Sequence, residues 1–493
     1  MRKLFILFTA LFLVVASPLL AEDNIAVDRI VVSPSLILTE EEIDTVIELC
    51  SEEFSGVELL NAVVDILNQL YLEKGYPNAI AYIPEQTFED GVVRIELLEG
   101  KVGNITVKGN GFTSEKYILD YLEMEKGEIL NLDKFEKKLI SFNRWNSGAS
   151  ISSELNPGEE TGTTDITINT EEEFPMRAFF TFDNYASQAL EKVRYGAHVS
   201  SANITHLRET LSAGVYFSKH LITPYADASI GLGTRLRLGA NFSYGTTHAE
   251  AIKEASIDFG SKSLSNGIYG TYALFRNDRA HLGLNVSFDY SRSTSELMDV
   301  TVLTEHKYYA LRTGFSFIFA GDRFLLSTSN AVSGTREESE DHIYYKFSGS
   351  SQISYRFSDI IHLVVNSVYQ VMPFDMYVPD TEKIYIGGAS TVRAYSEGNT
   401  IWGKDGYTLC TEFRFFDPAN RNSYFFLFAD HGGVFSYPDT GENFLFSFGG
   451  GLVLTKGNWL TINFAAGMNG IPVTQDVDHH VVRAHIGVTI NTP

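Results

Sequence analysis

The sequence predicts a β-barrel membrane protein that carries two small α+β domains ahead of the barrel. Three observations predict this class: an N-terminal export signal, a βααββ order of elements that occurs twice, and a long C-terminal region of two-faced strands. We therefore expect a signal peptide at 1–21, small domains at 22–101 and 102–175, and a barrel at 176–493.

The first residues, "MRKLFILFTALFLVVASPLLAED", have the features of a secretory signal peptide. Arg2 and Lys3 precede an apolar run that reaches Val15, and small residues and Pro18 follow. This run is too short and has the wrong flanks for a membrane anchor, so we expect cleavage after Ala21 and export of the protein.

Composition limits the function further. The chain has 38 Lys and Arg residues against 62 Asp and Glu residues, and its net charge of −24 repels nucleic acid. Beyond the signal no run of about 18 apolar residues occurs, so residence in a membrane would require strands. Cys50 and Cys410 fall in different expected domains, and we predict no disulfide between them.

Residues 25–101 have the order strand, helix, helix, strand, strand. Thr39 and Glu42 stand at capping-box spacing at the start of the first helix, and Asp90-Gly91 supplies a hairpin turn. The expected elements are strands at 27–32, 79–83 and 92–97 and helices at 39–49 and 56–74. Helical spacing places one set of apolar residues on the inner face of the second helix: Val57, Leu60, Val64, Leu67 and Tyr71.

Residues 102–171 repeat that order. The expected elements are strands at 102–109, 149–155 and 164–170 and helices at 113–124 and 132–143. Repetition of a unit of about 75 residues indicates tandem small domains. Two helices cover one face of each sheet, so an edge is left free to accept another strand.

From Met176 onward the helical period gives way to strand alternation. In "HLGLNVSFDYS" (281–291) apolar and polar residues alternate without a break, and 235–245 and 482–491 behave in the same way. Strands with one apolar and one polar face occur in a membrane barrel with a wet lumen and also in a large soluble sheet.

The connections favour the barrel. Short turns such as "GLGT" and "RNDRA" alternate with long polar connections, which we expect at 245–256, 291–306, 333–342 and 436–443. Short turns at one rim and long loops at the other are typical of outer-membrane barrels, and abundant Tyr and Phe suit interfacial girdles. We count about sixteen antiparallel strands, enough to enclose an aqueous channel.

One connection has no strand period. It holds "GGASTVRAYSEG" (387–398), lies between residues 370 and 407, and is extracellular if the N-terminal domains are periplasmic. Half of it, fully extended, reaches about 60 Å, so it could run into the lumen and back. Gly387 and Gly388 allow a sharp reversal there.

This stretch resembles the Val-Arg-Gly-Tyr/Phe loop of the POTRA-and-barrel outer-membrane superfamily, with Val392, Arg393 and Tyr395 in place. In "FFLFADHGGVF" the residues Phe428, Asp430 and Gly432 match the aromatic-x-Asp-x-Gly strand motif of that superfamily. The resemblance implies a lumenal loop lock in which Arg393 pairs with Asp430. A guanidinium suits this role because its rigid fork binds a carboxylate bidentately. The alternative is a solvated loop arginine and a turn aspartate.

The N-terminal repeats narrow the resemblance. Residues 75–110 resemble the first-POTRA signature of the hemolysin secretion/activation (two-partner secretion, TpsB) translocators. The matching residues are Gly75, Tyr76, Pro84, Gln86, Asp90, Gly91, Glu99 and Gly100. The family implies type V secretion: a monomeric outer-membrane barrel, embedded in lipid, whose periplasmic POTRA domains capture an unfolded partner exoprotein in extended form. Ala394 departs from the usual Gly, and the chain ends in "INTP" instead of an aromatic residue.

Two other functions are alternatives to two-partner secretion. A barrel-assembly or insertion factor would use the same scaffold, whereas a passive porin or receptor leaves the repeats unexplained. The chain has no HExxH, GxSxG or GxxxxGK[ST] motif, so we expect no enzyme activity, cofactor or nucleotide. His479, His480 and His485 show no ligand periodicity, and we expect no metal site.

Overall fold

The protein was analysed as a computed structural model. It describes residues 27–87, 91–186, 193–252, 257–297, 301–338, 341–374, 378–379, 382–395, 397, 400–435, 443–471 and 482–492. The expected signal peptide and Asp90 of the expected hairpin turn lie outside these residues. Contacts divide the chain into two compact units, and the second unit holds Thr106–Met124, Lys137–Glu154 and Thr167–Pro493. The domain borders expected from the sequence stay a prediction.

The first repeat forms a three-stranded sheet with two helices. Its elements are β1 (Arg29–Val32), α2 (Glu40–Glu53), α3 (Gly56–Glu73), β2 (Ile80–Tyr82) and β3 (Val92–Leu98). The strand order is β1-β3-β2, with β1 parallel and β2 antiparallel to β3. The capping box at Thr39 and Glu42 is formed, so two backbone N–H groups at the start of α2 have partners.

The two helices bury one apolar stripe each against this sheet. On α3 the stripe includes Leu60, Val63, Leu67 and Tyr71, all at most 2% exposed. Val57, which the sequence placed on this face, lies in the first turn of α3 and is 44% exposed. Successive buried residues of this stripe are three, four and four positions apart. On the helix, Val57 lies to one side of the stripe that they form.

Two polar residues of the POTRA-like signature hold backbone segments in this domain. Glu99 accepts hydrogen bonds from the main-chain N–H groups of Leu36 and Ile37 and from the Tyr71 hydroxyl. The Gln86 amide bonds both the N–H and the carbonyl of Arg94 on β3, at 2.8 Å each. Strand β2 is too short to pair with β3 at Arg94. The Gln86 amide therefore satisfies the backbone of Arg94 instead.

The second repeat has the same order of elements. These are β4 (Lys101–Lys108), α4 (Glu115–Leu122), α5 (Leu132–Trp145), β5 (Ala149–Pro157) and β6 (Thr163–Glu172), with strand order β4-β6-β5. Its core has an aromatic centre in which Tyr117, Tyr121 and Phe142 pack with ring centroids 5.2–6.0 Å apart. No helix in the described part of the chain is long and apolar enough to cross a membrane.

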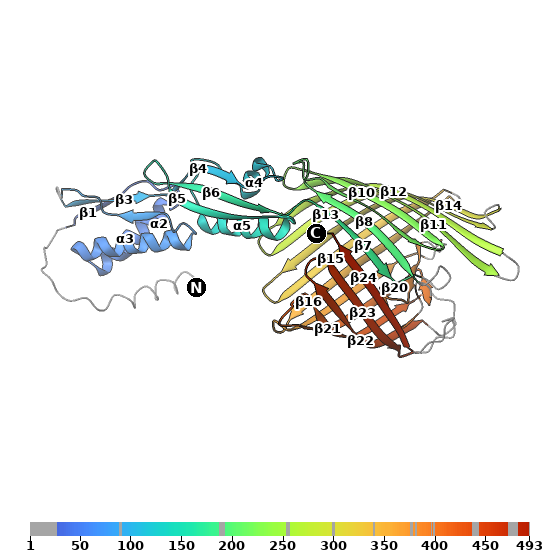
Figure 1. Ribbon diagram of the computed structural model, residues 1–493. Helices are drawn as coiled ribbons and strands as arrows, with labels where there is room; N and C mark the ends of the chain where they lie inside the picture. The colour runs from blue at the N-terminus through green and yellow to red at the C-terminus, as the bar shows by residue number, and fades with distance from the viewer. Residues whose placement is uncertain are drawn as a thin grey trace. The chain divides into compact units, whose positions relative to one another are not determined.

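The C-terminal region is a closed antiparallel barrel of sixteen strands, as expected (Figure 1). The strands are β7 (Met176–Asp183), β8 (Arg194–Ala202), β9 (Thr210–Ser218), β10 (Leu221–Leu232), β11 (Leu236–Ile252), β12 (Ile257–Arg276), β13 (Ala280–Leu297), β14 (Thr301–Ala320), β15 (Phe324–Glu337), β16 (His342–Arg356), β17 (Ile361–Val371), β20 (Gly406–Phe416), β21 (Tyr424–Val434), β22 (Phe444–Lys456), β23 (Leu460–Asn469) and β24 (Val482–Asn491). Pairing of β24 with β7, from Gly487 opposite Asp183 to Asn491 opposite Phe179, closes the barrel.

The barrel strands turn apolar side chains outward. On β13 the side chains of Leu284, Val286 and Phe288 are 44–50% exposed, whereas Asp289 is 9% exposed and faces inward. The same alternation runs along β21, where Phe425 and Leu427 are exposed and Phe428 and Asp430 are buried. An apolar outer surface around a polar interior suits a lipid-embedded barrel, so the sequence alternation is explained.

Three connections that the sequence predicted to be long are short. Strands β11, β13 and β15 continue into the polar segments 245–256, 291–306 and 333–342, and only a few residues join each to the next strand. Polar side chains do not prevent pairing, because the backbone ladder is still satisfied by the neighbouring strand. Most of the fourth predicted connection, 436–443, lies outside the described residues.

The buried thiol of Cys50, 2% exposed, offers a test of this core. Burial raises the pKa of this thiol, which lowers its reactivity further. We expect Leu67→Ala to destabilise the first POTRA domain by about 3 kcal/mol, because it leaves a cavity. In a Cys410→Ser background, the urea concentration that exposes Cys50 to a maleimide should fall. Leu72→Ala, on the same helix but 60% exposed, should leave it unchanged.

Candidate functional site

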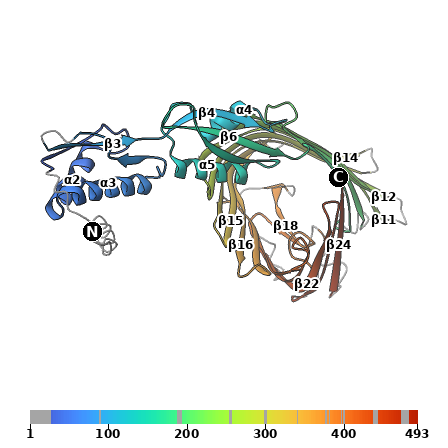
Figure 2. The ribbon, with the colours of Figure 1, turned by 60° about the vertical axis from the view of Figure 1, so that its left-hand side comes forward.

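The connection between β17 and β20 folds back against the inner wall of the barrel. It contains two short strands, β18 (Ile384–Ile386) and β19 (Ile401–Gly403), which pair as a hairpin (Figure 2). Four of its residues, Ile386, Val392, Tyr395 and Ile401, are 0% exposed and form one cluster with Val434 on β21 and Leu445 on β22. The segment is therefore a packed plug of side chains and backbone rather than a solvated loop.

Arg393 pairs with Asp430 at the centre of this contact. Its Nε lies 2.8 Å from Oδ2 of Asp430 and its second terminal nitrogen 2.8 Å from Oδ1, so the contact is bidentate. The main-chain N–H of Arg393 donates a third hydrogen bond to Oδ2, at 3.1 Å. Asp430 is 0% exposed and Arg393 is 8% exposed. The alternative of a solvated arginine and a turn aspartate does not describe this geometry.

A second carboxylate completes the charge balance. Oε1 of Glu412 on β20 lies 2.7 Å from the remaining terminal nitrogen of Arg393, and Arg414 holds the other oxygen of Glu412 at 2.7 Å. Two guanidinium groups thus face two carboxylates in a region of low exposure. Because buried charges are tolerated only when paired and hydrogen-bonded, this network depends on each member. Neither Glu412 nor Arg414 was predicted from the sequence, because each occupies an ordinary position of strand β20.

Two aromatic rings pack against the guanidinium group of Arg393. The Cζ atom of Arg393 lies 3.8 Å from the centroid of Phe428 and 5.6 Å from that of Phe426. Glycines on the neighbouring strands make room for these rings. A Cβ atom at Gly449 or Gly467 would lie within 2.7 Å of Phe428, and one at Gly451 would lie 2.4 Å from Phe426. Phe428 therefore acts as a platform for Arg393.

The other residues of the predicted lock also contact the barrel wall. The Tyr395 hydroxyl lies 2.9 Å from the carbonyl oxygen of Phe446 and 2.7 Å from that of Ile471. Val392 is 0% exposed and packs over Gly432, where a Cβ atom would lie 3.0 Å from a methyl carbon of Val392. The lack of a side chain at Gly432, in the strand motif, thus leaves room for Val392 of the loop.

The backbone of the loop reverses through left-handed conformations. Gly387 and Gly388 have φ values of +128° and +106°, and Ala394 has a φ of +81°. A Cβ atom at Gly388 would lie 2.1 Å from a carboxylate oxygen of Glu397. The position where this chain has Ala in place of the usual Gly is therefore one where Gly is conformationally favoured.

The base of the loop has a second attachment, to β16 and β17. Nζ of Lys346 lies 2.5 Å from Glu382, and both side chains are at most 15% exposed. The Gln370 amide donates to the carbonyl oxygens of Glu382 and Lys404, at 2.8 and 2.9 Å, which are the two ends of the β18–β19 hairpin. Neither Lys346 nor Gln370 was predicted, because each occupies an ordinary lumen-facing position of its strand.

The described residues contain no group of three or more His, Cys, Asp or Glu that could hold a metal ion. His479 and His480 lie outside the described residues. His485 faces the loop, with Nδ1 3.3 Å from Oε1 of Glu397. Both cysteines are free thiols, and Cys410 donates to the Thr391 carbonyl oxygen at 2.8 Å. The loop therefore covers Cys410.

A polar barrel with a loop packed against its inner wall, preceded by POTRA sheets, defines a class, the outer-membrane transporters of the POTRA-and-barrel type. The family profile described as "Haemolysin secretion/activation protein ShlB/FhaC/HecB" matches residues 162–454, more than half of the chain. A profile for the "POTRA domain, ShlB-type" matches residues 25–100. The chain belongs to the ShlB/FhaC/HecB family of two-partner secretion transporters, which export a partner protein across the outer membrane and are not enzymes.

Individual relatives agree with this assignment. The heme/hemopexin transporter protein HuxB of Haemophilus influenzae (strain 86-028NP) is 24% identical over 403 residues, which cover 77% of this chain and 70% of HuxB. The structure of CdiB from Escherichia coli matches with a TM-score of 0.74 at 18% identity, over 97% of this chain and 93% of that one. CdiB from Acinetobacter baumannii gives 0.70 at 16% identity, over 100% and 97%. The two structural matches concern the fold.

The strain at Ala394 can be tested with Cys410 as a reporter, because the loop covers this thiol. In a Cys50→Ser background, Ala394→Gly should stabilise the seated loop by about 1 kcal/mol by removing the left-handed penalty on Cβ. The rate at which a maleimide labels Cys410 should then fall about fivefold. Ala389→Gly, at a position whose φ is not positive, should not slow labelling. Equal slowing by both variants would contradict the assignment.

Proposed function

We propose that this transporter passes its partner exoprotein through the barrel lumen as an extended, unfolded chain, and that the seated loop closes the lumen between export events. The observation that carries this proposal is the Arg393–Asp430 contact, which holds the loop against the inner wall. A folded partner would not fit a barrel of about sixteen strands that also contains a packed loop. Folding outside would make passage one-way, so no nucleotide is needed.

The POTRA domains are proposed to receive the partner in the periplasm. In the first domain β2 is an edge strand, and its Ile80 and Tyr82 are 46% and 39% exposed. In the second domain β5 is an edge strand, and its Leu155 is 41% exposed. Asn68 already bonds the backbone of Ala81 on β2, and Asn143 bonds that of Ile151 on β5, so strand addition would displace these amides or use the rest of each edge beside the exposed apolar side chains. We further propose that the transporter acts as a monomer, since its barrel closes within one chain.

The loop is proposed to act as a lock with two attachments. The tip is held by the buried network around Arg393, and the base is held by Lys346 and Gln370. The base also packs in an apolar cluster of Tyr344, Met372 and Val378, each at most 6% exposed. Release of the tip alone would leave the loop tethered to β16, so the loop swings aside without leaving the barrel.

Substitution of Arg393 tests the lock. Arg393→Ala should destabilise the seated loop by about 3–5 kcal/mol, because Asp430 is left buried and unpaired. Labelling of Cys410 should become at least about a hundredfold faster, and secretion of the partner should fall because the loop no longer has a defined resting position. Arg393→Lys should give a labelling rate and a secretion level between those of Arg393→Ala and the unchanged protein, since an ammonium group lacks the bidentate fork.

The matched control is Arg421→Ala, which removes the same charge from an ion pair with Asp359 that is 64–70% exposed. It should leave secretion and Cys410 labelling unchanged. Barrel abundance in the outer membrane is measured for every variant. Normal secretion by Arg393→Ala at normal abundance would remove the lock from the mechanism.

The two attachments also predict a non-additive effect. Lys346→Ala alone should speed Cys410 labelling only slightly, because the network around Arg393 still seats the tip. Combined with Arg393→Ala, it should speed labelling by more than the product of the single effects, with a coupling of about 1–2 kcal/mol. The charge-exchanged pair Lys346→Glu with Glu382→Lys should reverse this gain. Additive rates would show that the base and the tip move independently.

A further inference from the structure

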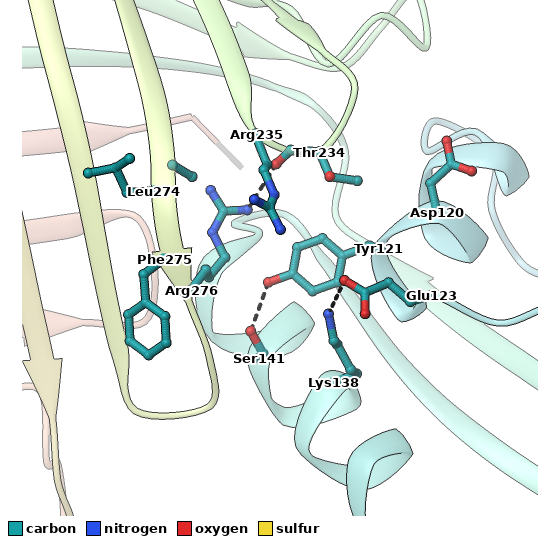
Figure 3. A pocket seen from close by; sticks show the side chains of 11 residues that line it. Asp120, Tyr121, Glu123, Lys138, Ser141, Thr234, Arg235, Leu274, Phe275 and Arg276 are labelled. Atoms are coloured by element: carbon teal, nitrogen blue, oxygen red, sulfur yellow. Dashed lines mark hydrogen bonds and ion pairs between the residues drawn. The ribbon is translucent and has the colours of Figure 1, made fainter. Parts of the chain in front are cut away.

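A pocket lies within the second unit, where α4 and α5 meet the short turns that follow β10 and β12 (Figure 3). It has a volume of about 130 Å³. One wall carries Tyr121 and Lys138, and the facing wall carries Arg235 and Arg276. The pocket has room for a carboxylate or phosphate group but not for a folded domain.

The pocket belongs to a cluster of four arginines on neighbouring parts of the barrel rim: Arg208, Arg235, Arg237 and Arg276. In the part of the chain that the structure describes, the hydrogen bonds of Arg208, Arg237 and Arg276 go to carbonyl or hydroxyl oxygens, and none goes to a carboxylate. Nε of Arg276 is buried without a partner. In a chain of net charge −24, this concentration of positive charge is unusual.

The carboxylates that line the pocket already have lysine partners. Glu123 lies 2.6 Å from Nζ of Lys138, and Asp120 lies 3.3 Å from Nζ of Lys116. They therefore do little to neutralise the arginines on the facing wall. Like charges held close together are costly unless an anion lies between them, so the cluster is suited to bind one.

Aromatic rings hold two of the guanidinium groups in place. Cζ of Arg208 lies 3.9 Å from the ring centroid of Tyr117, and Cζ of Arg276 lies 5.7 Å from that of Tyr121. Burial, together with Arg237 and Arg276 nearby, lowers the pKa of the Arg208 guanidinium. The positive charges are thus fixed by packing before any ligand arrives, which reduces the entropic cost of binding.

The register of the strands decides from which side a ligand approaches. Arg276 pairs with His281 on β13, which has the inward parity of Asp289. Arg237 donates to Ser229, which is 4% exposed, and Arg235 stands in the turn directly before β11. Leu274 and Phe275, which also line the pocket, are 45% and 49% exposed. By strand parity Arg237 and Arg276 stand on the lumen-facing side of their strands.

We propose that this arginine cluster is a binding site for acidic side chains of the exported polypeptide, engaged as the extended chain passes from the second POTRA domain into the lumen. The proposal rests on the proposed route through the barrel and adds a chemical preference to it. A guanidinium pair such as Arg235 and Arg276 would bind one aspartate or glutamate side chain at a time. Contacts to single side chains are weak enough to let a moving chain leave.

The test uses the full chain in detergent and a fluorescent twelve-residue peptide of repeated Gly-Ser-Glu, measured by anisotropy at low salt. Its twin has Gln in place of Glu. We expect the Glu peptide to bind at least about tenfold more tightly than the Gln peptide, and Arg235→Gln to remove about tenfold of that affinity. Arg235 is exposed, so its substitution should not disturb folding. Arg276→Gln is the second variant.

The control is Arg323→Gln, on the short turn between β14 and β15, which removes the same charge from an exposed position outside the pocket. It should leave peptide binding unchanged. Equal weakening by Arg323→Gln would indicate a diffuse field and overturn the site. Displacement of the peptide by low millimolar phosphate or by short-chain phosphatidylglycerol would assign it to a free anion or a lipid headgroup. No Arg393 variant is used in this test. A negative result would therefore rule out the arginine site without bearing on the proposed lock.

Discussion

The buried contact between Arg393 and Asp430 is the constraint on which the rest of the lumen depends. A bidentate ion pair at 0–10% side-chain exposure is stable only if the remaining charges nearby are balanced, and here Glu412 and Arg414 balance them. The loop gains a fixed position against the inner wall from this contact. Removal of Arg393 leaves Asp430 buried without its ion-pair partner, whereas removal of Arg414 still leaves Glu412 paired with Arg393, so the network depends most on Arg393.

Packing around this network requires unusual backbone freedom on both sides. The loop turns through positive φ values at Gly387, Gly388 and Ala394, and the wall lacks side chains at Gly432, Gly449 and Gly467. These glycines let the loop and the platform ring Phe428 approach neighbouring backbone closely. Ala394 is the exception, because it keeps a strained conformation.

Charge is distributed along the proposed export route in a way that suits a moving, extended chain. Within the described residues, four arginines gather at the rim next to the second POTRA helices with no hydrogen bond to a carboxylate, whereas Arg393 on the loop is fully paired. An open positive site can bind passing acidic groups, and a paired site can only open or close. The acidic balance of the whole chain makes the rim cluster stand out from its surroundings.

The sequence by itself determined the strand alternation and the repeated βααββ order, because each is set by local spacing, and its resemblance to a known motif implied the pairing of Arg393 with Asp430. It did not determine the length of β11, β13 and β15, since polar segments pair as strands when their backbone finds a partner. Nor did it identify Glu412, Lys346 or the rim arginines. These side chains meet their partners only when the barrel closes, because the partners lie on segments distant in the chain. The spacing of residues within one strand therefore cannot predict these contacts.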